Sequence, residues 1–337
     1  GNYSTVSRAP LWPWIMSIIY YFTDKQVVFA QLFYCLLGSG TCVIIYLLSE
    51  ELFTKNIALL AGLIAASYTG LFIYDGWLYT ESLYTFCLTG LVYTLFMLQR
   101  FWQSESAKKD EANNARKSKI ILNKWVICSG LLLAAATLTR PNGPGLLGVI
   151  YLWAGIIIVT RIIKRELWLL FLQQIIAITL LAFLLTLPWS YRNYTVTHQF
   201  VLVATGMGEV LVGSYNDNVL LQPPANQGFW SPPKGTKIHD DINYTPSDDK
   251  NSTNQAITWI TSHMDKIPVL FALHLENMWK PYTYSHGLPI EEFPQRFSSR
   301  VIFLLIPLQS MPIFVLALLD CILTWRQRRK DFILIYI

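Results

Sequence analysis

The chain of 337 residues is 53% hydrophobic and only 14% charged, whereas a soluble domain of this size carries roughly 25% charged residues. Its formal net charge of +5 does not indicate nucleic-acid binding, because the basic residues cluster at the ends of long apolar runs. The cysteines also lie inside apolar runs, which excludes a disulfide framework and a cysteine-type zinc site in the polar segments; they are Cys35, Cys42, Cys87, Cys128 and Cys321.

The apolar runs predict an all-α, multi-span membrane protein. A membrane-crossing helix needs about 20 mostly apolar residues. Such runs lie at 27–48, 57–75, 80–98, 125–139, 143–160, 167–188 and 301–324, and an eighth begins at 332. Residues 11–22 are too short to span, and their Trp and Tyr content predicts an interfacial helix. The polar start and the apolar end suggest that both ends are cut, so we expect a fragment.

This pattern predicts three parts. Residues 1–188 should form a transmembrane helical bundle with the loops of the site, residues 189–300 an extracytoplasmic region, and residues 301–337 a truncated C-terminal membrane segment. The middle part is punctuated by Gly, Pro and Asn, which is typical of turns. We expect it to be a partly helical cap, with a plain loop at 206–218 and one amphipathic helix at about 254–279 that lies in the membrane interface.

The basic residues predict the orientation of the spans. Four short segments, 49–56, 99–124, 161–166 and 325–331, hold 15 of the 26 Lys and Arg residues. Because cytoplasmic loops are enriched in Lys and Arg, these segments should lie inside. Residues 1–26, the turn 75–81, the turn at Arg140 and the stretch 189–300 then lie outside. We therefore expect the site to face the non-cytoplasmic side.

Three arginines at the outer ends of apolar runs are candidates for binding a phosphate: Arg8, Arg140 and Arg192. A planar guanidinium can grip a phosphate through paired hydrogen bonds. Each arginine could instead anchor the chain to lipid headgroups. Arg140 stands out, because outer arginines are disfavoured and its Pro- and Gly-rich neighbours predict a fixed turn.

Two carboxylates, Asp75 and Glu81, bracket the predicted outer turn between the second and third spans. A carboxylate there could bind a metal, accept a proton from an acceptor, or orient an arginine. The alternatives are a solvated loop charge for Asp75 and a role at a helix N-terminus for Glu81. No pair of histidines has the spacing of a zinc protease, so the sequence assigns no metal.

Five segments, in this order, carry a resemblance to a known family. They read SRAPLWPWIMSIIYYF, AGLIAASYTGLFIYDGWLYTESLYTF, LLLAAATLTRPNGPGLL, LPWSYRNYTVTHQFVLVATGMGEVLVGSYND and AITWITSHMDKIPVLFALHLENMW. Together they resemble the C-type membrane glycosyltransferases, in particular the bacterial family 39 group of protein mannosyltransferases and lipid A aminoarabinose transferases.

The resemblance implies an inverting transfer of a sugar from a polyprenyl-phosphate donor to a lipid, glycan or protein acceptor at the outer membrane face. It also implies a bacterial inner membrane, with the site facing the periplasm or the cell exterior. By position, it implies that Arg8 and Arg140 contact the donor phosphate and that Glu81 is the acidic residue opening the third span. In that family a carboxylate in the first outer loop acts as base or metal ligand. We expect this main base upstream of Gly1, so a divalent metal stays open as a cofactor and activity of the fragment alone is in question.

Two other functions remain open at this point. A transporter or flippase of lipid-linked sugars would share the spans and arginines, although inverted repeats would favour it and none is evident. In a structural membrane subunit, changing Arg140 would leave function intact. Four glycosylation sequons, at Asn2, Asn193, Asn243 and Asn251, fall in the predicted outer stretches, where abundant Asn makes chance an adequate explanation.

Overall fold

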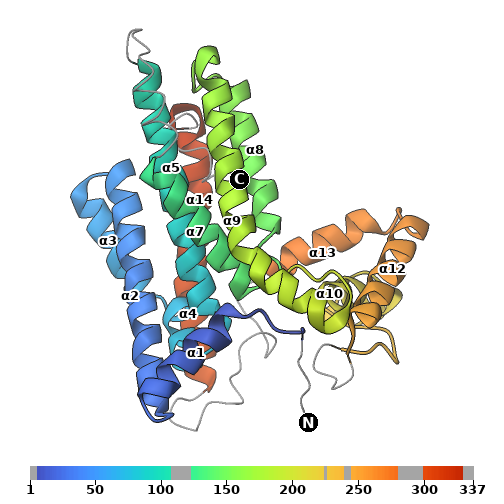
Figure 1. Ribbon diagram of the computed structural model, residues 1–337. Coiled ribbons are helices and arrows are strands. Elements are labelled where there is room, and N and C mark those ends of the chain that lie inside the picture. The colour runs from blue at the N-terminus through green and yellow to red at the C-terminus, as the bar shows by residue number, and fades with distance from the viewer. Residues whose placement is uncertain (1–5, 108–122, 224–225, 239–243, 280–298, 329–337) are drawn as a thin grey trace. The chain divides into compact units, whose positions relative to one another are not determined.

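The computed structural model describes residues 6–107, 123–223, 226–238, 244–279 and 299–328, and every regular element in these ranges is a helix (Figure 1). The prediction of an all-α membrane protein is therefore confirmed. The chain divides into two compact units, which are described one at a time. The helical unit comprises Pro10–Pro188 and Leu308–Ile337, and the loop-rich unit comprises Gly1–Ala9 and Trp189–Pro307.

The helical unit holds a helix at each of the seven predicted spans. In chain order its elements are α1 (Leu11–Phe22), α2 (Val27–Leu52), α3 (Lys55–Ser67), α4 (Thr69–Phe72), the 3-10 helix η1 (Ile73–Gly76), α5 (Thr80–Ala107), α7 (Lys124–Thr139), α8 (Gly145–Val159), the 3-10 helix η2 (Arg165–Leu167), and parts of α9 (Trp168–Thr197) and α14 (Ser299–Arg328). The predicted segment from 332 lies outside the described residues.

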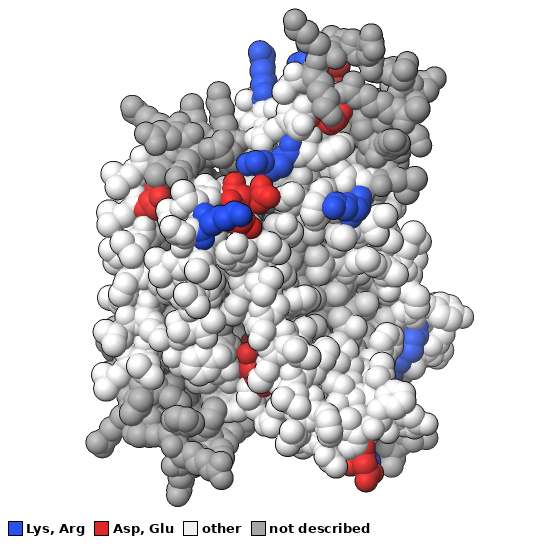
Figure 2. All heavy atoms as spheres, turned by 90° about the vertical axis from the view of Figure 1, so that its left-hand side faces the viewer, with Lys and Arg blue, Asp and Glu red and all other residues white. Residues whose placement is uncertain are grey.

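Three helical stretches of the described chain are long and apolar enough to cross a membrane, namely α2, α5 and 165–197. The bent pair of α3 with residues 69–76 makes a fourth if it counts as one span, while α7, α8 and residues 304–320 are apolar but shorter. Large apolar side chains stay exposed on these helices, for example Leu36 (70%), Leu63 (58%) and Leu184 (60%). Figure 2, which looks at the left-hand side of Figure 1, shows a broad band across the middle with almost no charged side chains. Such a surface suits lipid rather than water.

The core of the helical unit packs α5, α7, α8 and α9 around three buried aromatic side chains. The Phe171 ring lies edge-on to Trp102 and Trp153, at centroid distances of 6.0 and 5.8 Å. Each indole N–H has an amide partner: Trp102 donates to Gln174 Oε1 at 2.8 Å, and Trp153 donates to Gln99 Oε1 at 3.2 Å. A buried polar group without a partner would be costly, so these pairs let large aromatic rings fill the core.

The second predicted span, at 57–75, is broken rather than one continuous helix. α3 ends at Ser67, and Tyr68 takes an extended conformation (φ −77°, ψ 111°) before the chain continues in α4 and η1. The two parts differ in direction by 51°. The bend sends the residues around Asp75 back toward the neighbouring helices α2 and α5.

In the loop-rich unit, the plain loop predicted at 206–218 is wrong, because this stretch forms α10 (Met207–Ser214) and the start of α11 (Asp217–Leu221). Gly206 precedes α10 at a φ of 115°, which favours glycine. The Asp249 carboxylate accepts hydrogen bonds at 2.9 Å from the N–H groups of both Gly206 and Gly208. A carboxylate from a distant segment therefore caps the helix, which local sequence does not reveal.

The single amphipathic helix predicted at 254–279 is also wrong in extent. The structure has two helices, α12 (Pro246–Ser262) and α13 (Ile267–Trp279). Pro268 explains the division, since proline has no N–H for a continuing helix but fits its first turn. Of the apolar residues expected on one face, Leu270 is fully buried while Ile257 and Phe271 are 51% and 66% exposed. Their place in the membrane interface stays a prediction.

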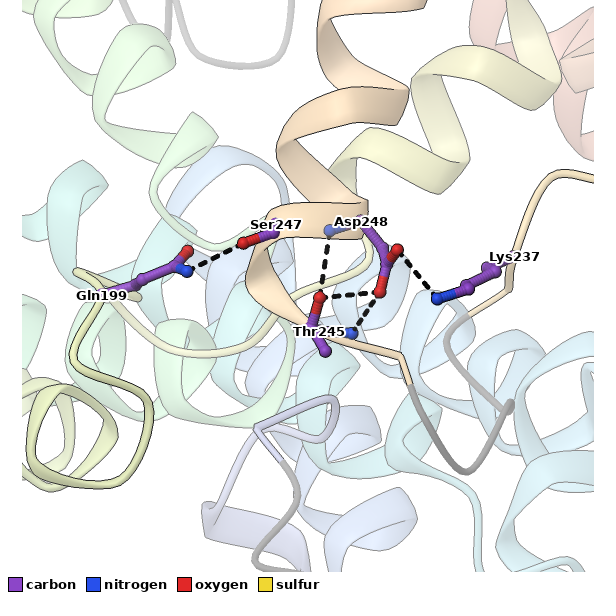
Figure 3. A network of polar contacts seen from close by, with 5 residues as sticks. All are labelled: Gln199, Lys237, Thr245, Ser247 and Asp248. Atoms are coloured by element: carbon purple, nitrogen blue, oxygen red, sulfur yellow. Dashed lines mark hydrogen bonds and ion pairs between the residues drawn. The ribbon is translucent and has the colours of Figure 1, made fainter.

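The start of α12 is fixed by a capping box (Figure 3). Thr245 Oγ1 accepts from the Asp248 N–H at 3.2 Å, and Asp248 Oδ2 accepts from the Thr245 N–H at 2.9 Å. Lys237 donates to Asp248 Oδ1 at 3.1 Å, and Gln199 donates to Ser247 Oγ at 2.8 Å. The hydrogen bond from Thr245 and the Lys237 charge lower the pKa of Asp248. Two loops are thus tied to the first turn of α12.

Candidate functional site

A small pocket of about 130 Å³ lies where α2, the α4–η1 segment and the start of α5 meet. Asp75 and Glu81 both line it, together with Tyr74, Ser82 and Thr85. Asp75 comes from η1, and its Oδ1 accepts a hydrogen bond of 2.7 Å from the buried hydroxyl of Ser82. The two carboxylates that the sequence singled out therefore lie at one site.

The Asp75 carboxylate packs directly on the backbone of α2 at Gly38. A Cβ added at Gly38 would lie 2.1 Å from Asp75 Oδ2, which is far inside van der Waals contact. The absence of a side chain at position 38 thus makes room for this carboxylate. Asp75 is held on one side by the Ser82 hydroxyl and on the other by a glycine surface.

The turn that separates Asp75 from Glu81 is held by two aromatic side chains from α1 and α2. Trp12 Nε1 donates to the Leu78 carbonyl at 2.9 Å, and the Tyr34 hydroxyl donates to the Tyr79 carbonyl. The two rings contact each other edge-on at a centroid distance of 4.4 Å. Leu78 has a φ of 55°, a left-handed conformation that few side chains favour. The aromatic donors stabilise an irregular backbone at the site.

Arg140 lies in a tight turn between α7 and α8. It ends α7 in an extended conformation, and its carbonyl accepts a 3.0 Å hydrogen bond from the Gly143 N–H. A Cβ at Gly143 would lie 2.3 Å from Thr137 Cα, so this close approach requires glycine. The Pro- and Gly-rich sequence therefore forms a fixed turn, as its composition predicts.

The turn brings the Arg140 guanidinium to the pocket. Arg140 Nη1 lies 3.3 Å from Glu81 Oε1, and the guanidinium lies 5.8 Å from the centroid of the Tyr84 ring. The side chains of Arg140 and Glu81 are 40% and 29% exposed. An exposed ion pair contributes little stability, about 1 kcal/mol or less. Its arrangement is more informative: a carboxylate and an aromatic ring orient a cation that still has surface open to a ligand.

The structure thus brings together three of the five predicted site residues, Asp75, Glu81 and Arg140. Arg8 and Arg192 belong to the loop-rich unit. The sequence places Arg192 directly after the span at 167–188. In the structure it lies inside α9, which continues to Thr197. Its guanidinium lies 4.6 Å from the Trp189 ring and donates to Asn193 Oδ1 at 3.1 Å. Arg8 has an exposed side chain, and its contact with a donor stays a prediction.

Ser82, Tyr84 and Gly38 take part in the site but were not singled out from the sequence. Ser82 and Tyr84 lie in the first turns of α5 beside Glu81, so a search for polar and aromatic neighbours of the acidic residue could have found them. Gly38 could not be found in this way, because only the rotation of α2 shows which of its residues faces Asp75.

The described residues do not offer a metal an evident donor set. No group of three His, Cys, Asp or Glu side chains gathers in the part of the chain that the structure describes. At the pocket, Asp75 already accepts from Ser82 and Glu81 already pairs with Arg140.

Comparison with known proteins gives one family match. Residues 7–110 match the family model described as dolichyl-phosphate-mannose-protein mannosyltransferase. This stretch contains Arg8, Asp75 and Glu81 but not Arg140. No curated protein and no solved structure matches the chain. The resemblance to C-type membrane glycosyltransferases is confirmed over these residues, and the match supports a membrane glycosyltransferase of this type.

Proposed function

We propose that this protein transfers a sugar from a polyprenyl-phosphate donor to an acceptor hydroxyl or amine, at the membrane face opposite its basic segments. The observation that carries the proposal is the Arg140–Glu81 pair beside a pocket that also holds Asp75. One cation and one separate carboxylate are what such a transfer needs. The donor's lipid tail would bring it to the site, so no soluble nucleotide-binding domain is required.

Arg140 is assigned to the donor phosphate. When the bond between the sugar carbon and the phosphate oxygen breaks, its electrons stay on the phosphate and negative charge grows there. A guanidinium held in place stabilises that charge more strongly in the transition state than in the ground state. Glu81 and Tyr84 hold Arg140 in position, so we assign Glu81 to orienting this arginine rather than to proton transfer.

Asp75 is assigned to the acceptor. As the acceptor oxygen or nitrogen bonds to the sugar carbon, it must lose a proton, and a nearby carboxylate can accept it. The Ser82 hydroxyl holds Oδ1 of Asp75, which fixes the direction of the carboxylate. The sugar is transferred, the proton goes to Asp75, and the lipid phosphate leaves with the bonding electrons.

The course of the helices supports a site on the non-cytoplasmic side. α5 begins at Thr80 beside the pocket and ends at Ala107, and α7 returns from Lys124 to the Arg140 turn. The basic segment 99–124 and the site are therefore at opposite ends of the same helices. Because basic segments favour the cytoplasm, the pocket should open to the other side.

The test is transfer activity of the full-length protein in membranes, measured with a panel of radiolabelled polyprenyl-phosphate sugars. Charge-assisted contacts contribute about 1.5–3 kcal/mol, so Arg140→Ala should lower transfer by roughly one to two orders of magnitude. Arg140→Lys should recover part of the activity, since lysine keeps the charge but loses the paired geometry.

Arg165→Ala is the matched control, because Arg165 is an exposed arginine in the predicted cytoplasmic segment 161–166. It should transfer at the parental rate, and all variants must insert normally. If a normally inserted Arg140→Ala protein is fully active, Arg140 only anchors the turn. The donor site would then have to be sought at Arg8 and Arg192.

A further inference from the structure

The break in the second span leaves backbone groups without their helical partners. At Tyr68 the helix is interrupted, between the end of α3 at Ser67 and the start of α4 at Thr69. In a hydrocarbon environment a freed N–H or C=O must find a partner within the protein. A break in a membrane helix is therefore stable only where another element supplies those partners.

α14 supplies them through one side chain. Gln309 Oε1 accepts a hydrogen bond of 2.8 Å from the Thr69 N–H, and Gln309 Nε2 donates a hydrogen bond of 3.0 Å to the Ser67 carbonyl. The same amide thus joins the last residue of α3 to the first residue of α4. Beside it, the Tyr68 hydroxyl lies 2.7 Å from the hydroxyl of Ser310, which is only 2% exposed.

The segment that begins at this amide also lines the pocket. Gly70, Leu71, Tyr74 and Asp75 follow Thr69 directly, and all four border the cavity. They form α4 and η1 without any further break before Asp75. The direction in which this segment leaves α3 therefore decides where the Asp75 carboxylate lies.

We propose that Gln309 is a positioning residue for Asp75: its amide holds the break at Tyr68 and so aims the α4–η1 segment into the pocket. The inference rests on the proposed function, in which Asp75 accepts the proton of the acceptor. It assigns to the C-terminal helix a part in catalysis, although the family match ends at residue 110.

The chemistry of the amide gives a distinctive test. Position 309 must accept from one backbone group and donate to another, which an amide does at every pH. A carboxyl group reproduces this pattern only when it is protonated, and leucine never does. Gln309→Glu should therefore be impaired at high pH and recover as the pH falls, whereas Gln309→Leu should stay impaired throughout.

Steady-state transfer should show the effect in kcat. We expect Gln309→Leu to lower kcat by about tenfold, with the donor KM changed by less than about twofold, because Arg140 is untouched. The activity of Gln309→Glu relative to the parent should be about tenfold lower at pH 8 and should rise several-fold toward pH 5.5. Leu308→Ala is the control, since Leu308 is 71% exposed on the same turn of α14.

A second measurement does not depend on transfer. In a background without the native cysteines, Leu71→Cys places a thiol on the segment that lines the pocket. Its rate of labelling by a water-soluble maleimide should rise at least about threefold when Gln309→Leu is added, because the segment opens more often. Leu308→Ala should leave the rate unchanged.

The outcomes separate the two proposals. Increased labelling in a protein whose parent transfers no donor sugar would support the role of Gln309 and count against the proposed function. Parental labelling and parental kcat in Gln309→Leu would overturn the inference. A loss of kcat that Gln309→Glu does not relieve at low pH, with labelling unchanged, would also overturn it, because Gln309 would then act by packing alone.

Discussion

Each of the two units is stabilised internally by a different kind of interaction. In the helical unit, the fully buried rings of Trp102, Trp153 and Phe171 contact one another among aliphatic residues. In the loop-rich unit the buried apolar residues are mostly small, such as Val203 and Val219. There, polar side chains donate to backbone carbonyls of distant segments.

The residues after Trp189 show clearly how polar side chains donate to backbone carbonyls in the loop-rich unit. Asn193 is fully buried, and its Nδ2 donates to the carbonyls of Val201 and Val203 at 3.2 and 2.9 Å. Ser190 Oγ donates to the Leu202 carbonyl at 2.6 Å. These bonds fasten the irregular stretch after α9 to the helix itself. They also mean that the sequon at Asn193 is not available for glycosylation in the folded protein.

The difference follows from how each unit satisfies its backbone. Helices satisfy their own N–H and C=O groups, so in the helical unit the side chains mainly need to fill space. Loops leave carbonyls unpaired, and buried ones need donors from side chains. The helical unit also uses side-chain donors of this kind where its backbone is irregular, for example at the break around Tyr68 and at Leu78 beside the site.

The largest effect on stability should come from removing an aromatic ring in the helical unit. Trp153→Ala leaves a cavity next to Phe171 and removes the indole donor of Gln99 Oε1. We expect a loss of about 3 kcal/mol in the free energy of unfolding. Unfolding in mixed micelles would measure it. Tyr151→Ala on the same helix is the control, since Tyr151 is 44% exposed; equal losses in both variants would refute packing as the main support.

In the loop-rich unit, a polar substitution should have nearly as large an effect. Asn193→Ala removes the amide donor of the buried Val201 carbonyl and leaves the Val203 carbonyl with the Trp189 indole, which costs about 2 kcal/mol. Amide hydrogen exchange in residues 199–205 should accelerate accordingly. Asn218→Ala is the matched change, because Asn218 makes only a 3.4 Å side-chain contact to the Pro232 carbonyl. Similar exchange in the two variants would show that Asn193 does not hold the loop.

At the site, a substitution that adds a single methyl group should affect activity rather than stability. Gly38→Ala displaces the Asp75 carboxylate, and we expect transfer to fall about tenfold, equivalent to about 1.4 kcal/mol in the barrier. Unfolding should be little changed, because alanine favours the helix more than glycine does. Gly148→Ala is the control, since nothing lies within 4 Å of a Cβ there. Full activity of Gly38→Ala would remove Asp75 from the mechanism.

The smallest effect is expected at the cap of α12. Thr245→Ala should destabilise the first turn by about 1 kcal/mol, seen as faster amide exchange there. Because the pKa of Asp248 is lowered in the folded state, its contribution is present above the ordinary Asp pKa of about 3.9 and is lost as the pH falls through the lowered value. The effect of the cap should therefore shrink in strong acid. Ser262→Ala, at the far end of the helix, should show no such pH dependence.

The sequence predicts the helices of the helical unit well, because a run of apolar residues of membrane length has few alternatives in lipid. It does not predict the break at Tyr68, because the partner that makes the break tolerable, Gln309, lies 240 residues away from Thr69. The division between α12 and α13 can be predicted from the sequence, since Pro268 marks it. The cap of α10 by Asp249 cannot be predicted in this way, because Asp249 lies 43 residues away from Gly206.

For the site, the sequence predicts that Asp75, Glu81 and Arg140 lie at one end of the bundle, because the helices alternate in direction. It cannot give their pairing, which depends on the rotation of α5 and α7 about their axes. It also places Arg192 after its helix, whereas α9 continues through it. The orientation of the spans and the roles of all five residues stay predictions.

The hairpin that carries Arg140 is short, and this has a consequence for the membrane. α7 and α8 have 16 and 15 residues, which at 1.5 Å per residue give lengths of about 24 and 22 Å. A typical hydrocarbon core is about 30 Å thick, so a hairpin inserted from the basic side ends several ångströms short of the opposite headgroups.

The bilayer must adapt to this mismatch, and thinning around the short hairpin costs only fractions of a kcal/mol per ångström. We therefore expect a local depression of the outer leaflet above the Arg140 turn. Headgroups and water would follow the depression down to the guanidinium. A lipid phosphate could then reach the arginine while its tail stays in the hydrocarbon, so the thickness of the surrounding membrane should itself influence how easily a lipid-linked donor is bound.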